Sequence, residues 1–145
     1  MYEDVLVPTD GGDRMGDVIE QALDVARHRD ATVHALSVVD ERAFLTLDDE
    51  LTDEVASELR TEAEAAIEEV VDSADAAGVP IEAAIRRGKP AAEIESYART
   101  IDADLIVVGS RGAGSYEQNL LGSVSQTVVS GAERPVLTVP LAGDG

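Results

Sequence analysis

Glycine and hydroxyl residues gather in the segment 109–125, where they could bind phosphate groups. An apolar run that ends at Val108 leads directly into this segment, and a helical pattern begins near its end. Glycine lets backbone N–H groups approach an anion closely, and a helix N-terminus adds free donors and about half a positive charge. Such a segment could hold a triphosphate with few cations, although its composition is equally typical of a flexible, glycine-capped surface loop. The residues concerned are Gly109, Gly112, Gly114, Gly122, Ser123 and Ser125.

Two standard phosphate-binding motifs do not match this segment. Gly109 and Gly114 have the spacing of a P-loop, but Ser115 stands where that motif requires Lys. Gly112 and Gly114 begin a dinucleotide fingerprint, but Glu117 occupies its last glycine position. The sequence therefore supports neither a P-loop ATPase nor an NAD enzyme. Arg111 could bind a phosphate or pair with carboxylates, and the sequence alone does not separate the two.

A second polar segment, residues 8–12, follows the first apolar run of the chain. Asp10 within it could accept a hydrogen bond from a ligand or could cap the turn, a position where Asp is common. The two histidines are weaker candidates for a functional site. His28 lies near the end of a helical pattern, where a surface role is expected, and His34 has no neighbouring Cys or His to complete a metal site.

Apolar runs alternate with helical spacings and predict an α/β protein with an open parallel sheet and helices on both faces. Strands are expected at residues 4–7, 31–39, 81–85, 105–108 and 136–139, and helices are expected to begin near residues 13, 48, 90 and 123. The second helix is long and acidic, and ends at Gly78. Ligands of such sheets bind at the carboxyl ends of strands where the strand order reverses. The polar segments after the first and fourth strands have suitable residues for this position.

Composition and charge narrow the function further. The chain has 145 residues, no Cys, and 30 acidic against 11 basic residues, which gives a net charge of −19. One domain over residues 1–141 with a frayed tail at 142–145 is expected, and a disulfide scaffold or thiol nucleophile is excluded. A surface with this negative charge repels nucleic acids and anionic membranes, and neither is therefore expected as a partner.

No signal peptide or membrane span is recognisable, which predicts a cytoplasmic location. The shortage of Lys and large aromatic residues favours adaptation to molar salt over an ordinary acidic protein.

The long spacing of four residues in the glycine segment resembles a known signature. Gly109, two residues, Gly112, nine residues, then Gly122 and Ser123 is similar to the nucleotide-binding signature of the universal stress protein family, in its ATP-binding branch. The opening residues 5–10 and the later stretch 134–137 are similar as well, and the resemblance covers nearly the whole chain. One departure is Gly12, where many relatives have Ser; Asp13 is then expected to cap the first helix.

The resemblance implies a sheet order of 3-2-1-4-5 and a site for ATP, or another adenine nucleotide, between the first and fourth strands. Mg²⁺ is expected through the phosphate oxygens, with no metal ligand from protein side chains alone. Asp10 would lie near the ribose, Val38 would contact the adenine, and Gly88 would lie on the far side of the base. The expected contacts with the adenosine or the phosphates also include Pro8, Thr9, Gly109, Arg111, Gly112, Gly122, Ser123, Val124 and Ser125.

Three functions remain open at this point. The first is a regulatory stress-response protein that holds ATP as a sensed ligand. The second is an ATP hydrolase, expected to be slow at most because the signature loop has no carboxylate before Glu117. The third is a nucleotide-free dimeric interaction module, against which the intact glycines argue. A homodimer through the last strand, Val136 to Val139, is expected because this strand lies at the sheet edge in the implied order. Alternatively, Pro135 and Pro140 blunt that edge and keep a monomer.

Overall fold

Strands and helices alternate along the chain in the computed structural model, which describes residues 3–11, 15–110 and 120–140. All four expected helices and all five expected strands are present, together with a short 3₁₀ helix, η1, that the sequence did not reveal. The elements are β1 (Asp4–Pro8), α1 (Met15–Arg29), β2 (Thr32–Asp40), η1 (Glu41–Phe44), α2 (Asp49–Ala77), β3 (Ile81–Gly88), α3 (Pro90–Ile101), β4 (Leu105–Ser110), α4 (Leu120–Gly131) and β5 (Val136–Pro140). The predicted α/β class is confirmed.

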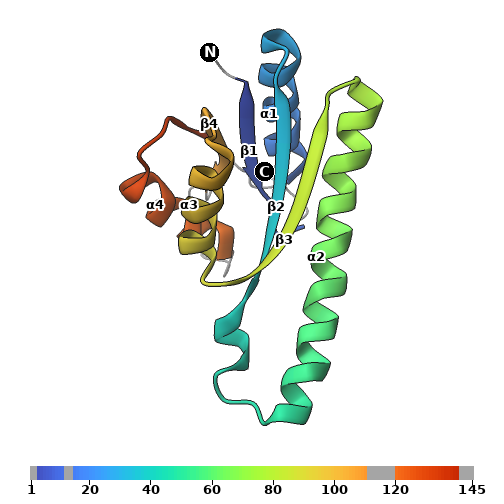
Figure 1. Ribbon diagram of the computed structural model, residues 1–145, viewed down its shortest axis with the longest axis vertical. Helices are drawn as coiled ribbons and strands as arrows, with labels where there is room; N and C mark the ends of the chain where they lie inside the picture. Colours follow the sequence, from blue (N-terminus) through green and yellow to red (C-terminus); the bar gives the residue numbers. More distant parts are fainter. Residues whose placement is uncertain (1–2, 12–14, 111–119, 141–145) are drawn as a thin grey trace.

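The five strands are all parallel and form one open sheet in the order β3-β2-β1-β4-β5 (Figure 1). This is the predicted order, and it places the reversal of strand order between β1 and β4. Helices α1 and α2 pack on one face of the sheet, and α3 and α4 pack on the other. The carboxyl ends of β1, β2 and β4 therefore meet at one end of the molecule.

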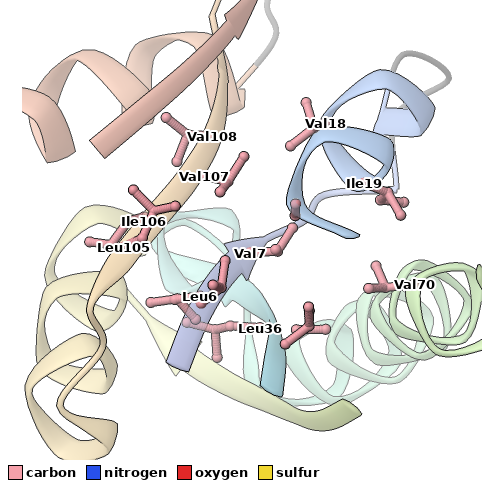
Figure 2. Packing of buried hydrophobic residues seen from close by; sticks show 14 of the residues in the cluster. Leu6, Val7, Val18, Ile19, Leu36, Val70, Leu105, Ile106, Val107 and Val108 are labelled. Carbon is pink, nitrogen blue, oxygen red and sulfur yellow. The ribbon is translucent and has the colours of Figure 1, made fainter. Parts of the chain in front are cut away.

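The core lies between the sheet and its two helical layers. Leu6, Val7 and Val107 are completely buried, because the central strands β1 and β4 are covered on both faces. Successive side chains of a strand point to opposite faces, so that Val7 lies on the side of Val18 and Val70 (Figure 2). Burial of these continuous apolar strands stabilises the scaffold that carries the strand ends.

Helix α2 is longer than the sheet that it covers. It begins at the N-cap Asp48, whose side chain accepts a hydrogen bond of 2.9 Å from the backbone N–H of Leu51, and ends at Gly78 with φ +71°. Its 29 residues span about 43 Å. Its buried residues, Ala63, Ala66, Val70 and Ala74, all lie between the middle of the helix and its end. The first half of α2 and η1 project beyond the strand ends (Figure 1).

Polar contacts close the opposite, amino end of the sheet. His34 is buried in β2, and its Nε2 lies 2.8 Å from Oδ1 of Asp4 in β1. Asp104 accepts hydrogen bonds from the backbone N–H groups of Glu3 and Asp4, which ties the start of β1 to the residue before β4. His28 contacts the carbonyl oxygen of Asp24 on the surface of α1. In the described part of the chain, no helix has the length and apolar character needed to cross a membrane.

Candidate functional site

A small pocket of about 60 Å³ lies at the carboxyl ends of β1 and β2, on the face covered by α3 and α4. It is next to the place where the strand order reverses, the usual ligand position in open α/β sheets. Five of the residues predicted for the site are brought together in its wall: Pro8, Thr9, Asp10, Val38 and Val124. The pocket also contains Leu36, Asp40, Pro90 and Ile94, which the sequence reasoning missed.

The turn after β1 is held in place by Thr9. Its backbone N–H donates to the carbonyl of Leu36 at 2.8 Å, and its Oγ1 accepts a hydrogen bond of 3.2 Å from the N–H of Gly11. Gly11 has φ +75°, and a Cβ there would lie 3.1 Å from the Cβ of Ala66 in α2. The buried Thr9 and the close approach of Gly11 to α2 therefore fix the position of the exposed Asp10 at the pocket rim.

Alternation along β2 supplies one wall of the pocket. Leu36, Val38 and Asp40 occupy every second position, so they share one face of the strand. The helix that follows β3 supplies another part, because Pro90 and Ile94 lie one turn apart at the beginning of α3. Leu36 and Asp40 lie two residues on either side of the predicted Val38, and Ile94 lies one turn after the helix start at Pro90. Strand and helix periodicity could therefore have indicated Leu36, Asp40 and Ile94.

Asp40 places a charged group in this wall. Its side chain is 14% exposed, and its two carboxylate oxygens lie 2.9 and 3.0 Å from Nε of Arg42. Hydrogen bonds from the Arg42 side chain hold the pKa of Asp40 below its ordinary value of 3.8, against the opposing effect of burial. The carboxylate is therefore ionised at neutral pH and can accept hydrogen bonds from a ligand.

Gly88 lies at the end of β3, beside Asp40 in the strand register, and not in the pocket wall. It is buried, with φ +159°, and a Cβ there would come within 2.7 Å of Oε2 of Glu93. The backbone N–H of Glu93 in turn donates to the carbonyl of Lys89 at 2.9 Å, within the first turn of α3. In the structure, Gly88 permits a tight entry of the chain into α3.

The expected phosphate-binding residues lie at the end of β4 and at the beginning of α4. Gly109 is buried in β4, where it pairs with Val139, and Gly122 and Ser123 belong to the first turn of α4. Val124 is buried and lines the pocket, whereas Ser125 follows in the second turn. Arg111 and Gly112 lie outside the described residues. The N-terminus of α4 is therefore adjacent to the pocket, through Val124.

The chemistry of the pocket suits a nucleoside better than an anion. Its apolar side chains can pack against a flat ring, and the carboxylates of Asp10 and Asp40 can accept from hydroxyl or amine donors. An anionic group would be repelled by the two carboxylates but suits the N–H donors at the start of α4. At about 60 Å³ the pocket accommodates part of a ligand, since small-molecule sites usually measure roughly 300–1,000 Å³. Within the described ranges, no group of three or more acidic or His side chains could hold a metal ion.

Comparison with known proteins gives consistent results over almost the whole chain. A model of the universal stress protein family matches residues 1–140. Universal stress protein MJ0531 of Methanocaldococcus jannaschii is 39% identical over 140 residues, which cover 96% of this chain and 82% of that protein. Universal stress protein YxiE of Bacillus subtilis is 31% identical, with 96% of this chain and 99% of that protein covered.

Two solved structures are similar to this chain over almost its whole length. The structure of protein MJ0577, also from Methanocaldococcus jannaschii, superposes with a TM-score of 0.84 at 28% identity and covers 99% of both chains. A universal stress protein solved in complex with cAMP has a TM-score of 0.75 at 28% identity, and covers 97% of this chain and 99% of its own.

Proposed function

Because the chain belongs to the universal stress protein family, we propose that it is a stress-response regulatory protein of the ATP-binding branch, which holds ATP or another adenine nucleotide as a sensed ligand. The observation that carries the proposal is the pocket at the reversal of strand order. It combines apolar walls with two carboxylates and adjoins the glycine- and serine-containing first turn of α4. The cAMP complex of a relative with 28% identity supports an adenine ligand for this pocket.

The proposed orientation of the nucleotide follows from the apolar and charged side chains of the pocket. The base packs between Val38 and Ile94, and Asp10 accepts a hydrogen bond from the ribose. The phosphates extend to Gly109, Gly122 and Ser123, where helix N–H groups face them. Arg111 and Gly112 complete this side, Ser125 lies nearby, and Gly88 lies beyond the base. Mg²⁺ is held by the phosphate oxygens.

The experiment is a direct search for nucleotide. The purified protein is denatured, and the released ligand is identified by absorbance and mass spectrometry; an adenine nucleotide is expected in stoichiometric amount. Protein stripped of nucleotide should then bind ATP with Mg²⁺ in titration calorimetry. If neither co-purification nor titration detects an adenine nucleotide, the nucleotide-free dimeric module is the better assignment. A turnover assay tests the slow ATP hydrolase.

A matched pair of variants tests the phosphate contact. Gly122→Val places a side chain in the first turn of α4 and should abolish ATP binding while the fold persists. Gly16→Val is the control, because it also adds a branched side chain near the start of a helix, and a Cβ at Gly16 meets nothing within 4 Å. Equal ATP affinity in the two variants would contradict the proposed contact between the phosphates and the first turn of α4.

The proposal includes a homodimer through β5. This strand pairs with β4 on one side and is at the edge of the sheet, with Val136 and Leu137 half-buried and Thr138 exposed. Two copies that meet antiparallel about a two-fold axis would satisfy the outer backbone groups of both. We further propose that residues 1–141 form one domain, and that the charge of −19 reflects adaptation to high salt.

A further inference from the structure

A second and larger depression lies at the same end of β2, on the opposite face of the sheet. This α2 groove measures about 550 Å³ and lies between the end of β2, η1 and the middle of α2. Its lining includes Asp10, Val38, Asp40, Ala43, Leu59 and Glu62. Asp10, Val38 and Asp40 also border the nucleotide pocket, so the two depressions are separated by the end of a single strand.

A partly exposed apolar stripe, in which Val55 and Leu59 are half-buried, continues the α2 groove towards the start of the helix. Leu51, Val55 and Leu59 are spaced four residues apart and therefore share one face of α2. Leu59 lines the groove, and Leu51 is 46% exposed. Leu45, in the connection from η1 to α2, is 77% exposed. Two of the three large apolar side chains exposed in the described ranges thus lie on this projecting segment, and the third is Val129.

Acidic side chains predominate in the lining of the groove, which includes Asp10, Asp40 and Glu62 against Arg42. The surrounding segment 40–63 carries nine carboxylates and two arginines in total. Arg42, one of these arginines, is paired with Asp40, and the other, Arg60, lies 3.7 Å from Glu64. An apolar floor with acidic borders complements a segment that has apolar side chains on one face and Lys or Arg on the flanks.

The groove walls are held in place before any ligand arrives. The side chain of Asp40 accepts from the backbone N–H of Arg42 at 3.0 Å and caps η1. The guanidinium of Arg87 in β3 lies 4.2 Å from the ring centre of Phe44, which ties the other end of η1 to the sheet. A wall fixed in this way needs little ordering on binding, which favours affinity.

The backbone around the groove decides the form of the partner. β2 is hydrogen-bonded to β1 on one side and to β3 on the other, and α2 satisfies its own backbone. The groove therefore offers no open strand edge to an extended peptide. We propose that the α2 groove is the docking site for a basic amphipathic helix of a partner protein. A second copy of this chain is not expected in this groove, because the homodimer proposed above uses β5, which lies beyond β1 and β4 from the end of β2.

The test uses a synthetic helical peptide of Leu and Lys, with the leucines on one face, and a scrambled peptide of the same composition. Binding is measured by fluorescence anisotropy at the lowest salt concentration at which circular dichroism shows the fold to be intact, and the contacts are mapped by NMR chemical shifts. We expect the amphipathic peptide to bind one to one and about tenfold more tightly than the scrambled one. The shift changes should cluster in residues 37–63. Equal affinity of the two peptides, or shifts elsewhere, would overturn the proposal, because charge alone would then explain the binding.

Two variants with the same substitution sharpen the test. Ala43 is exposed and lines the groove, so Ala43→Phe fills the site without removing a packed side chain. Ala76 is exposed near the other end of α2 and provides the control Ala76→Phe. The first variant should weaken peptide binding about tenfold, and the second should not change it. Equal melting temperatures would confirm that both fold.

Oligomeric state distinguishes the alternative occupant. If Ala43→Phe converts a dimer of the unmodified protein into a monomer, the groove is occupied by a second copy and the proposal is wrong. If the dimer persists in Ala43→Phe and peptide binding is lost, the partner is a different protein. Because Asp10, Val38 and Asp40 border both depressions, each measurement is made on protein stripped of nucleotide and repeated with ATP and Mg²⁺. Peptide binding by the stripped protein that Ala43→Phe weakens supports the proposal whether or not ATP binds, so the two proposals fail separately.

Discussion

Individual residues at the strand ends determine how closely the chain can turn, and Gly88 is the sharpest case. Any Cβ at this position would meet the side chain of Glu93 at 2.7–3.0 Å, in a backbone conformation that favours glycine. Gly88→Ala should therefore lower the free energy of unfolding by roughly 1–3 kcal/mol. The double variant with Glu93→Ala should recover part of this loss, because it removes the contacting atoms. Urea unfolding of the three variants measures both effects; no recovery would show that the backbone alone causes the cost.

Asp40 allows a prediction of pH dependence. Its pKa is lowered in the folded protein, so its contribution to stability is present above the ordinary value of 3.8 and is lost as the pH falls through the lowered pKa. Asp40→Asn should therefore melt at a lower temperature than the unmodified protein at pH 7, and the difference should shrink below pH 3.8. Glu41→Gln, an exposed neighbour, serves as the control. A difference that is constant with pH would assign the effect to shape and not to charge.

The site residues could be predicted from the sequence only in part, for a physical reason. The first apolar run indicates the strand end with Pro8 and Asp10, and the resemblance to the universal stress protein family implies Val38 and Val124; the structure brings these four residues to one pocket. Asp40 could not be assigned, because the apolar run of β2 ends at Val39 while the strand pairs through Asp40 with Gly88. The ladder with β3, and not the residue types, determines that end.

At the scale of elements, the two ends of α2 should differ in their effect on stability. Gly78 caps the end that is anchored by buried Ala74 and Val79, whereas Asp48 caps the projecting end, where no described residue of the first turns is buried. Gly78→Ala should cost about 1 kcal/mol of global stability. Asp48→Ala should reduce the helix signal in circular dichroism with little change in the unfolding midpoint, although N-caps usually contribute about 1 kcal/mol. Equal losses in both variants would mean that α2 unfolds as one unit.

Helix periodicity also shows where sequence reasoning about elements ends. The apolar positions from Leu51 to Ala74 form one continuous stripe and predict one helix, which is confirmed. The stripe does not reveal that the sheet covers only its second half. Burial depends on where β2 and β3 stop, and this is a property of neighbouring elements, far away in the sequence.

For the whole molecule, salt should stabilise the fold. A charge of −19 on a protein of this size makes self-repulsion large at low ionic strength, and molar salt shortens the Debye length to about 3 Å. The melting temperature should rise from low to molar KCl. A variant with Glu50, Glu54 and Glu58 changed to Gln should show a smaller rise, because these exposed carboxylates lie together on α2. A melting temperature that does not change with KCl concentration would contradict the proposed adaptation to high salt.

The proposed dimer depends on which backbone groups of β5 point outward. Ile106 pairs with Val136 and donates to the carbonyl of Pro135, so parallel geometry directs the N–H of Leu137 to β4 and that of Thr138 to the outside. Thr138→Pro should therefore give monomers with an intact sheet, whereas Leu137→Pro should damage the sheet itself. Light scattering in molar KCl measures the mass. A monomer of the unmodified protein would contradict the dimer.

The strand order has a consequence for synthesis. Of the five strands, β1 is synthesised before the others, yet it lies in the middle of the sheet, between β2 and β4. Its neighbour β2 is complete at Asp40, but β4, which pairs with its other edge, begins only at Leu105. Until β4 is made, the growing chain carries an apolar strand, Val5 to Val7, that is buried in the folded protein but has one unpaired edge. Among the three strands with neighbours on both sides, β1 thus waits longest for its second neighbour during translation.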